Sequence, residues 1–233
     1  MIPAYKPGPE LAKVVHGLLN TSIASIVVVD DGSGAEYRSL FDQFTAVERI
    51  TILRHETNLG KGSALKTGIE HVRETLPTYA GVVTADADGQ HPVDDIVRVA
   101  ERFLQDPLCL VLGSRKFEGD VPWRSRLGNI ATRALFALLV GRVLRDTQTG
   151  LRAIPRDLFP TLLRIPSSHY EWELAVLIAA KHAGVRIVEE PIKTVYQAGN
   201  PTSHFHPLWD SLAVYKVLFR FPWVHLRTAM PRR

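Results

Sequence analysis

Two carboxylates two residues apart, Asp86 and Asp88, directly follow the apolar residues 81–84 in the segment TADADGQHP. Hard divalent cations such as Mg²⁺ and Mn²⁺ prefer oxygen ligands, and they commonly share a site between one or two carboxylates and substrate phosphates. An isolated pair of this kind is more often a solvated Asx turn. Because this pair follows an apolar run and stands among three other polar strand ends, we expect Asp86, Asp88 and Gln90 to bind a divalent cation together with a substrate diphosphate.

Three charged residues farther along the chain are candidates for catalysis. Arg115 closes an apolar run in the triplet GSR, and we expect its planar guanidinium to bind diphosphate oxygens in a bidentate manner. Asp146 in DTQTGLRA and Glu173 in HYEWEL are candidates for taking a proton from an acceptor hydroxyl. Each has a structural alternative, an Asx turn for the first and stabilisation of a helix amino terminus for the second. Arg126 is a further candidate, for an acceptor phosphate.

A second acidic pair, Asp30 and Asp31, follows the β-branched residues 23–29. An acidic residue at a strand end can accept hydrogen bonds from a ribose or a base, although a helix-capping role is the alternative. The stretch NLGKGSALKTG then places glycines and Lys61 before a helix, where backbone amides and the ammonium can face phosphate. The GxxxxGK[ST] spacing of a Walker loop is absent, so a tight turn is the alternative for this stretch.

The elements that position these residues alternate between strand and helix. Short β-branched or apolar runs predict strands at residues 23–29, 50–53, 81–84 and 108–112. Helical periodicity predicts helices at residues 9–19, 62–76 and 94–104. This order favours an α/β fold with a mostly parallel sheet, in which ligands bind beyond the carboxyl ends of the strands. The polar clusters at 3–5, 30–33, 86–90 and 113–115 are all expected at that edge.

Composition narrows the class of protein. The 233 residues, 45% of them hydrophobic, suffice for one large domain, and a formal charge of +4 suits an anionic partner. The single cysteine, Cys109, excludes an intrachain disulfide and favours a reducing compartment. We expect no secretory leader and no spanning helix, because the first residues lack a signal pattern and no apolar stretch approaches about 20 residues. Dispersed basic residues and the lack of a recognised module argue against nucleic acid.

The pattern changes after about residue 122. Apolar helices punctuated by arginine, a short strand near residues 185–188 and an aromatic, basic tail follow. Bulky apolar groups and positive charges alternate over 203–233, as in an interfacial helix, and the apolar helix expected at 127–140 could lie beside it. The alternative is that both helices pack on the sheet as core. We expect a peripheral association with the cytoplasmic side of a membrane.

Eight motifs together resemble the inverting glycosyltransferases of family 2, which have the GT-A fold, and among them the dolichyl-phosphate and polyprenyl-phosphate sugar synthases. In chain order the motifs are PAY from Pro3, VVDDGS from Val28, NLGKG from Asn58, DADGQHP from Asp86, GSR from Gly113, DTQTG from Asp146, EWEL from Glu171 and SHF from Ser203. The match covers nearly the whole chain.

The resemblance implies a GT-A sheet flanked by helices over residues 1–202, with C-terminal amphipathic helices. The nucleotide-sugar half spans about 1–121, the acceptor half about 122–202, and 203–233 form the membrane-associated tail. The donor site then comprises Pro3, Tyr5, Val29, Asp31, Lys61, Asp86, Ala87, Asp88 and Arg115. The acceptor phosphate would meet Arg126, Ser203 and His204. The family commonly has Asn-Glu after PAY, where this chain has Lys6 and Pro7, and often a lysine at the position of His204.

The function implied by the resemblance is inverting transfer of a hexose from a nucleotide-sugar, of the GDP-mannose or UDP-glucose type, to a polyprenyl or dolichyl phosphate with Mg²⁺ or Mn²⁺. An ionised lipid phosphate needs no strong base, whereas a sugar hydroxyl needs a carboxylate to take its proton. Three alternatives stay open: a family 2 transferase acting on a sugar hydroxyl in glycolipid or polysaccharide synthesis, a nucleotide-sugar-binding protein without turnover, and a nucleotidyltransferase. The sugar, the base and the oligomeric state are not determined by the sequence.

Overall fold

A computed structural model describes residues 1–115, 144–147, 149–169 and 171–193 of the chain. Several predictions fall outside these residues: the apolar helix at 127–140, the tail at 203–233, and the acceptor candidates Arg126, Ser203 and His204. They stay predictions.

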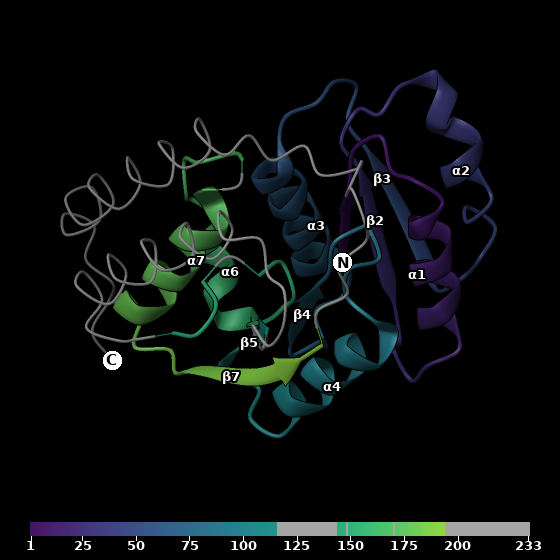
Figure 1. Cartoon of the computed structure of the whole chain (residues 1–233). Coiled ribbons are helices and arrows are strands. Elements are labelled where there is room, and N and C mark those ends of the chain that lie inside the picture. Colours follow the sequence, from purple (N-terminus) through teal and green to yellow (C-terminus); the bar gives the residue numbers. More distant parts are fainter. Residues whose placement is uncertain (116–143, 148, 170, 194–233) are drawn as a thin grey trace, which may run out of the picture.

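Strands form the centre of the described part of the molecule (Figure 1). They are β1 (Ile2–Ala4), β2 (Ile26–Asp30), β3 (Ile50–Arg54), β4 (Gly81–Thr84), β5 (Leu110–Arg115), β6 (Arg152–Pro155) and β7 (Ile187–Ile192). Their hydrogen bonds give two groups, β1-β2-β3 and β4-β6-β5-β7. Two further bonds join the groups side by side, from the Met1 nitrogen to the Val83 carbonyl (2.7 Å) and from the Ala85 nitrogen to the Met1 carbonyl (3.1 Å).

Strand direction decides where the polar clusters meet. β1, β2 and β3 pair in parallel, as do β5 and β7, whereas β6 runs antiparallel to both β4 and β5. The carboxyl ends of β1, β2, β4 and β5 therefore lie along one edge of the sheet, hereafter the carboxyl edge. This confirms the α/β class and the mostly parallel sheet, but β6 was not predicted, because RAIP is too short to show a strand period.

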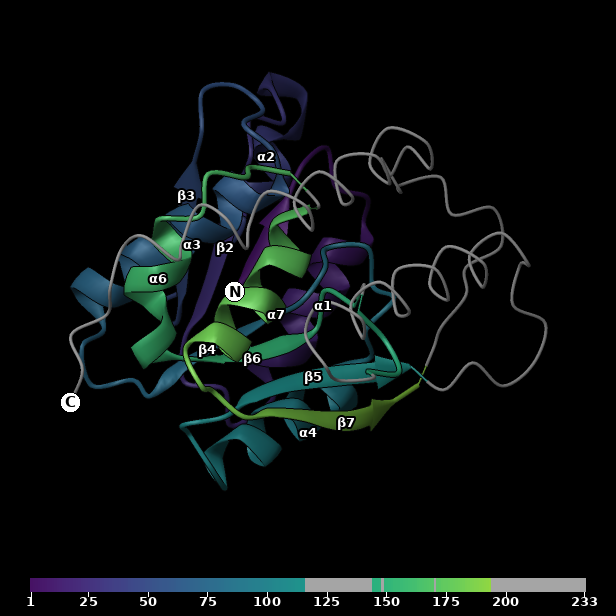
Figure 2. The ribbon, with the colours of Figure 1, turned by 90° about the vertical axis from the view of Figure 1, so that its left-hand side faces the viewer.

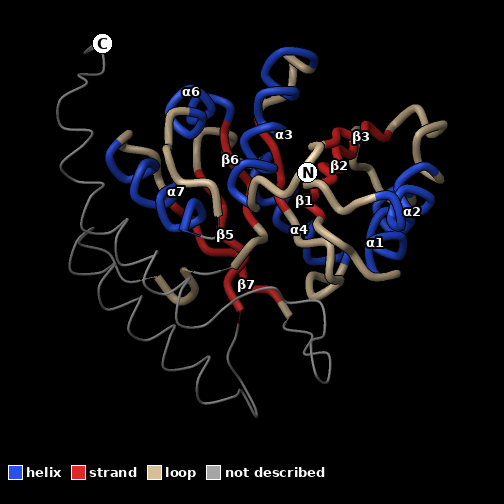
Figure 3. The backbone as a smooth tube through the Cα atoms, turned by 90° about the horizontal axis from the view of Figure 1, so that it is seen from above, coloured by secondary structure: helices blue, strands red, loops and turns tan. Residues whose placement is uncertain are grey.

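Helices cover both faces of the sheet (Figures 2 and 3). The longer ones are α1 (Glu10–Leu19), α3 (Lys61–Thr75), α4 (Val93–Leu104) and α7 (Glu171–His182); α2 (Arg38–Asp42) and α6 (Phe159–Leu163) are short, and Ala35–Tyr37 and Arg156–Leu158 form 3-10 turns. In β2, Val27 and Val29 join the core that contains residues of α3, α6 and α7, while Ile26 and Val28 join the core that contains residues of α1 and α4. This alternation is what a strand buried on both faces requires.

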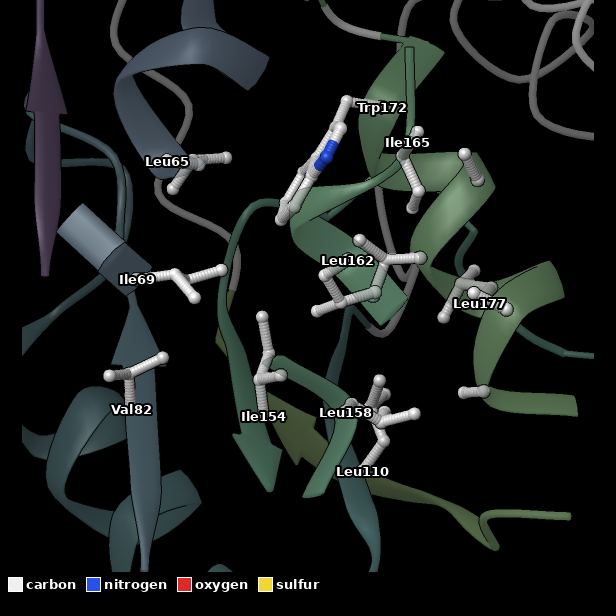
Figure 4. Packing of buried hydrophobic residues seen from close by; sticks show 14 of the residues in the cluster. Leu65, Ile69, Val82, Leu110, Ile154, Leu158, Leu162, Ile165, Trp172 and Leu177 are labelled. Atoms are coloured by element: carbon white, nitrogen blue, oxygen red, sulfur yellow. The ribbon is translucent and has the colours of Figure 1, made fainter. Parts of the chain in front are cut away.

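The packing of α7 against α3 brings two distant segments to the carboxyl edge. Trp172, 1% exposed, lies in the core with Leu65, Ile165 and Leu162 (Figure 4). A Cβ placed on Gly62 would lie 2.7 Å from the Cβ of Trp172, so only glycine permits this approach. The first turns of α3 and α7 are consequently neighbours. No helix among the described residues has the length and apolar character needed to cross a membrane.

Candidate active site

Three charged side chains from distant parts of the chain meet beyond the end of β4. The Lys61 ammonium lies 2.6 Å from Asp86 Oδ1 and 2.8 Å from Glu173 Oε1. Lys61 is the first residue of α3, Asp86 follows β4, and Glu173 lies in the first turn of α7. We call Lys61, Asp86 and Glu173, with the buried Arg152 described below, the charged centre.

The charges in this centre shift one another's pKa. Burial disfavours the charged forms of both Lys61 and Asp86, but their mutual attraction outweighs it. Asp86 and Glu173 raise the pKa of the Lys61 ammonium above its ordinary value, and Lys61 and His91 hold the pKa of the Asp86 carboxyl well below its usual range. Both groups are therefore ionised at neutral pH.

Asp86 lies in a close-fitting cradle. His91 Nε2 is 3.3 Å from its Oδ2, and a Cβ added to Gly150 would lie 2.4 Å from the same oxygen. The backbone at Gly150 is tied to β4 because the Thr84 hydroxyl donates to the Gly150 carbonyl at 2.7 Å. Any side chain at position 150 would displace the carboxylate.

Asp88 lies beside this cradle, and the pair of aspartates suits a divalent cation. Burial and the negative charge of Asp86 raise the pKa of the Asp88 carboxyl, which means that the two carboxylates repel each other. Asp88 Oδ1 accepts a hydrogen bond from the Gln90 nitrogen at 3.0 Å, and this bond fixes the turn. The described residues hold no cluster of three or more His, Cys, Asp or Glu suited to a metal. Two carboxylates that would share a cation with substrate phosphates still fit Mg²⁺ or Mn²⁺.

Arg115 and Asp146 form a bidentate pair at the end of β5. Arg115 Nε and Nη2 both donate to the Asp146 carboxylate, the latter at 3.1 Å. The Asp146 side chain is fully buried, whereas that of Arg115 is 22% exposed. Arg115 therefore lies at the carboxyl edge, as predicted for the end of its strand. The pair places Asp146 beside it, which was not predicted, and the carboxylate orients the guanidinium.

Arg152 is a functional candidate that the sequence analysis missed. Its guanidinium, on β6 and nearly fully buried, donates to the backbone carbonyls of Thr147, Thr149 and Glu173. Burial lowers the pKa of Arg152, and Glu173, Asp146 and Asp86 oppose this shift. One buried cation thus lies among three acidic groups of the site. The sequence held one sign of its role, because Arg152 directly follows the DTQTGL segment that contains the candidate Asp146.

Asp31 is bound by donors of the protein itself. Its Oδ1 lies 2.6 Å from His55 Nδ1 and accepts a hydrogen bond from the Leu59 nitrogen at 2.9 Å, and its Oδ2 accepts one from the Gly60 nitrogen at 2.8 Å. His55 Nε2 in turn lies 2.9 Å from the Thr67 hydroxyl. We call these five residues the Asp31 network. The carboxylate, which follows β2, therefore ties the loop between β3 and α3 to the end of β2.

The remaining donor-site candidates divide between the edge and the core. Pro3 is buried in β1 and pairs with Val29, whose side chain is fully buried in the core and contributes no side-chain surface to the edge. Tyr5 follows β1 with the Lys6 ammonium 5.5 Å from its ring centre. Ala87 packs against the core that contains α1 and α4 residues.

Comparisons with known protein sequences relate this chain to sugar transferases. The model of the family described as Glycosyl transferase family 2 matches residues 1–163. A UDP-N-acetylglucosamine–dolichyl-phosphate N-acetylglucosaminyltransferase of Methanococcus voltae is 32% identical, with 84% of each chain covered. A polyprenol monophosphomannose synthase of Mycolicibacterium smegmatis is 26% identical, over 82% of this chain and 75% of that protein.

The fold has counterparts among solved structures. Glucosyl-3-phosphoglycerate synthase from Mycobacterium tuberculosis, crystallised with Mn²⁺, UDP and phosphoglyceric acid, superimposes with a TM-score of 0.64 at 19% sequence identity. The match covers 94% of this chain and 74% of that one. The predicted GT-A fold is thereby confirmed.

Proposed function

Because the chain belongs to glycosyl transferase family 2, we propose that it is an inverting enzyme that moves a hexose from a nucleotide-sugar to a polyprenyl or dolichyl phosphate. The names of the two sequence relatives support this acceptor class, since both act on a lipid phosphate. One relative is named for UDP-N-acetylglucosamine and the other for mannose transfer, so the donor is proposed only as a nucleotide-activated hexose.

The choice of a lipid phosphate as acceptor is supported chiefly by one observation: each of the two candidate bases is held in an ion pair. Asp146 is fully buried in its pair with Arg115, and Glu173 is paired with Lys61 at 2.8 Å. A carboxylate committed to a cation is a poor acceptor for the proton of a sugar hydroxyl. A phosphate acceptor is already ionised and does not require such a base. This arrangement therefore favours a lipid phosphate over a hydroxyl acceptor.

In the proposed reaction the acceptor phosphate oxygen attacks the anomeric carbon, the bond to the nucleoside diphosphate breaks, and the configuration inverts. Mg²⁺ or Mn²⁺ bound at Asp86 and Asp88 would supply Lewis-acid stabilisation of the departing diphosphate. Arg115, oriented by Asp146, would bind the same developing charge through its planar guanidinium. Asp31 would act on the nucleotide indirectly, by fixing the loop that precedes Lys61.

The test is a transfer assay with labelled UDP-glucose, UDP-N-acetylglucosamine and GDP-mannose, each offered with Mg²⁺ or Mn²⁺. A short polyprenyl phosphate is the acceptor, and the same polyprenol without phosphate is the matched control. We expect a lipid product from one donor, only with the phosphate and only with metal. Transfer to the free polyprenol or to a sugar hydroxyl instead would contradict the acceptor proposal, and nucleotide-sugar binding without any transfer would indicate a binding protein.

The membrane part of the proposal rests on the sequence of residues 203–233 and 127–140, which lie outside the described residues. Each basic residue near anionic lipid contributes about 1 kcal/mol, so binding should weaken with salt. Liposome flotation with and without anionic lipid, comparing the full chain with one ending at Pro201, tests it. Equal behaviour of the two chains, or no flotation at low salt, would remove the membrane proposal.

A further inference from the structure

Lys61 and a divalent cation compete for the same carboxylate. The Lys61 ammonium lies 2.6 Å from Asp86 Oδ1, which is a contact distance for a direct ion pair. Asp86 is also one of the two carboxylates that fit Mg²⁺ or Mn²⁺. An ammonium and a metal ion carry like charges, and neither can approach this oxygen closely while the other occupies the contact.

The backbone around Lys61 is held in place by its neighbours. The ammonium can therefore leave Asp86 only by rotation of the Lys61 side chain. Gly60 adopts φ = 96°, its nitrogen donates to Asp31, and its carbonyl accepts from the Ala64 nitrogen at 3.0 Å. Gly62 packs directly against Trp172, and the Ser63 nitrogen donates to the Ser168 carbonyl at 3.0 Å. The first turn of α3 is thus attached on both sides, and the ammonium moves by rotation of the lysine side chain alone.

Glu173 gives the ammonium a second anchor. Its carboxylate lies 2.8 Å from Lys61 Nζ, and its helix is packed on α3 through Trp172. If Lys61 leaves Asp86, Glu173 keeps the charge compensated and close to the carboxyl edge. The group suited to receive the released ammonium is an anion that arrives together with the metal, such as a nucleoside diphosphate.

We propose that Lys61 couples metal binding to donor binding, with Glu173 as its positioning residue. Without a diphosphate, Lys61 stays on Asp86 and opposes the cation; with a diphosphate, the ammonium turns to the phosphate oxygens and Asp86 becomes available to the metal. The inference rests on the proposed binding of a nucleotide-sugar at this edge. Linkage requires that the coupling be reciprocal: nucleotide raises the affinity for metal by the same factor as metal raises the affinity for nucleotide.

The experiment measures free Mn²⁺ by electron paramagnetic resonance during titration of the full chain, without nucleotide and with saturating UDP or GDP. In the wild type we expect weak binding of Mn²⁺ alone and a gain of about 5- to 150-fold on adding the nucleotide that binds, which is the usual span of such couplings. Lys61→Gln should bind Mn²⁺ alone at least about fivefold more tightly and lose most of the gain. Lys61→Arg, which keeps the charge, should behave like the wild type.

Two further variants separate this coupling from a general change of charge. Lys181→Gln removes a positive charge from an exposed residue in the last turn of α7, at the opposite end of the helix from Glu173, and should leave the gain from nucleotide intact. Glu173→Gln removes the carboxylate that competes with Asp86 for Lys61, so Mn²⁺ alone should bind more weakly than in the wild type. Circular dichroism and thermal melting confirm that each variant is folded.

The outcomes separate the coupling from the proposed function. Equal Mn²⁺ affinity in wild type and folded Lys61→Gln, or a change no larger than that of Lys181→Gln, would overturn the coupling. Retention of the full nucleotide gain in Lys61→Gln would do the same. If the wild type binds neither UDP nor GDP with Mn²⁺, the proposed function fails, while the titration with Mn²⁺ alone still decides whether Lys61 opposes the metal.

Discussion

The Asp31 network and the charged centre meet at consecutive residues, Gly60 and Lys61, yet they use their carboxylates in opposite ways. Asp31 is 3% exposed and accepts hydrogen bonds from backbone nitrogens of the loop it stabilises. Asp86 is paired with side chains alone, the Lys61 ammonium and the His91 ring. Backbone donors cannot leave without unfolding the loop, whereas side-chain partners can be exchanged for a ligand.

The difference indicates which acidic residues of a site are available for chemistry. A carboxylate bound by backbone amides has its charge committed to the fold, so its contribution is to position neighbouring atoms. A carboxylate compensated by a mobile ammonium can pass from one cation to another at small structural cost. Four predictions test this distinction, in order of decreasing effect.

Breaking the Arg115–Asp146 pair should have the largest effect on stability. Arg115→Met leaves the fully buried Asp146 without its bidentate partner, and loss of one member of a buried pair costs about 3–5 kcal/mol. Arg115→Lys keeps the charge but not the fork, so it should lose less stability and still lose turnover. Urea unfolding and single-turnover assays measure both. An unfolding free energy for Arg115→Met within about 0.5 kcal/mol of wild type would contradict a structural role.

Asp88→Asn should reduce turnover by at least about 10²-fold, because it removes a negative ligand from the site that stabilises the departing diphosphate. Asp88 is only partly buried, so the melting temperature should stay close to that of the wild type. Asp94→Asn, which changes an exposed carboxylate at the start of α4, is the matched control and should retain activity. Unchanged donor affinity of Asp88→Asn in calorimetry with metal present would count against the metal site.

Asp31→Asn should lower the unfolding free energy by about 1–3 kcal/mol, because an amide group cannot accept all of the hydrogen bonds that the carboxylate accepts. Its affinity for Mn²⁺ alone should not change, which would sharpen the contrast with the charged centre. Asp42→Asn, at an exposed pair with Arg54, is the control and should stay within about 0.5 kcal/mol. A loss of Mn²⁺ binding in Asp31→Asn would show that the two regions do not act separately.

The smallest expected effect is on acid stability. The pKa of Asp86 is depressed in the folded state, so its contribution to stability is present above the unfolded value of about 3.9 and is lost as the pH falls below it. Lys61→Gln removes the main source of that depression. The variant should therefore lose stability less steeply below about pH 4, by at most about 1.4 kcal/mol per pH unit for one proton. Urea unfolding at pH 3 to 5 measures the unfolding free energy of both proteins. The same slope of this free energy against pH in wild type and Lys61→Gln would contradict the ion pair.

Local patterns along the chain were enough to predict the alternation of strands and helices and the order of the polar clusters. Apolar runs such as residues 81–84 are bounded by turn residues, and α3 and α4 have clear helical periodicity, so their local patterns were sufficient. The position of Asp86 and Asp88 at the carboxyl edge followed from the parallel arrangement. Family membership was predicted from eight motifs in order and confirmed by the match over residues 1–163.

Which of these groups are partners depends on contacts between elements that are far apart along the chain. Lys61 was expected at a diphosphate, and its pairing with Glu173, more than a hundred residues away, depends on the packing of Trp172 against Gly62. The role of Arg152 depends on β6 running antiparallel between β4 and β5, which no local pattern indicates. Side-chain periodicity reports burial along one element, whereas ion pairs depend on the separation of atoms carried by different elements. The sequence therefore predicted which kinds of charged residue lie at this site, but long-range packing determines which of them form ion pairs.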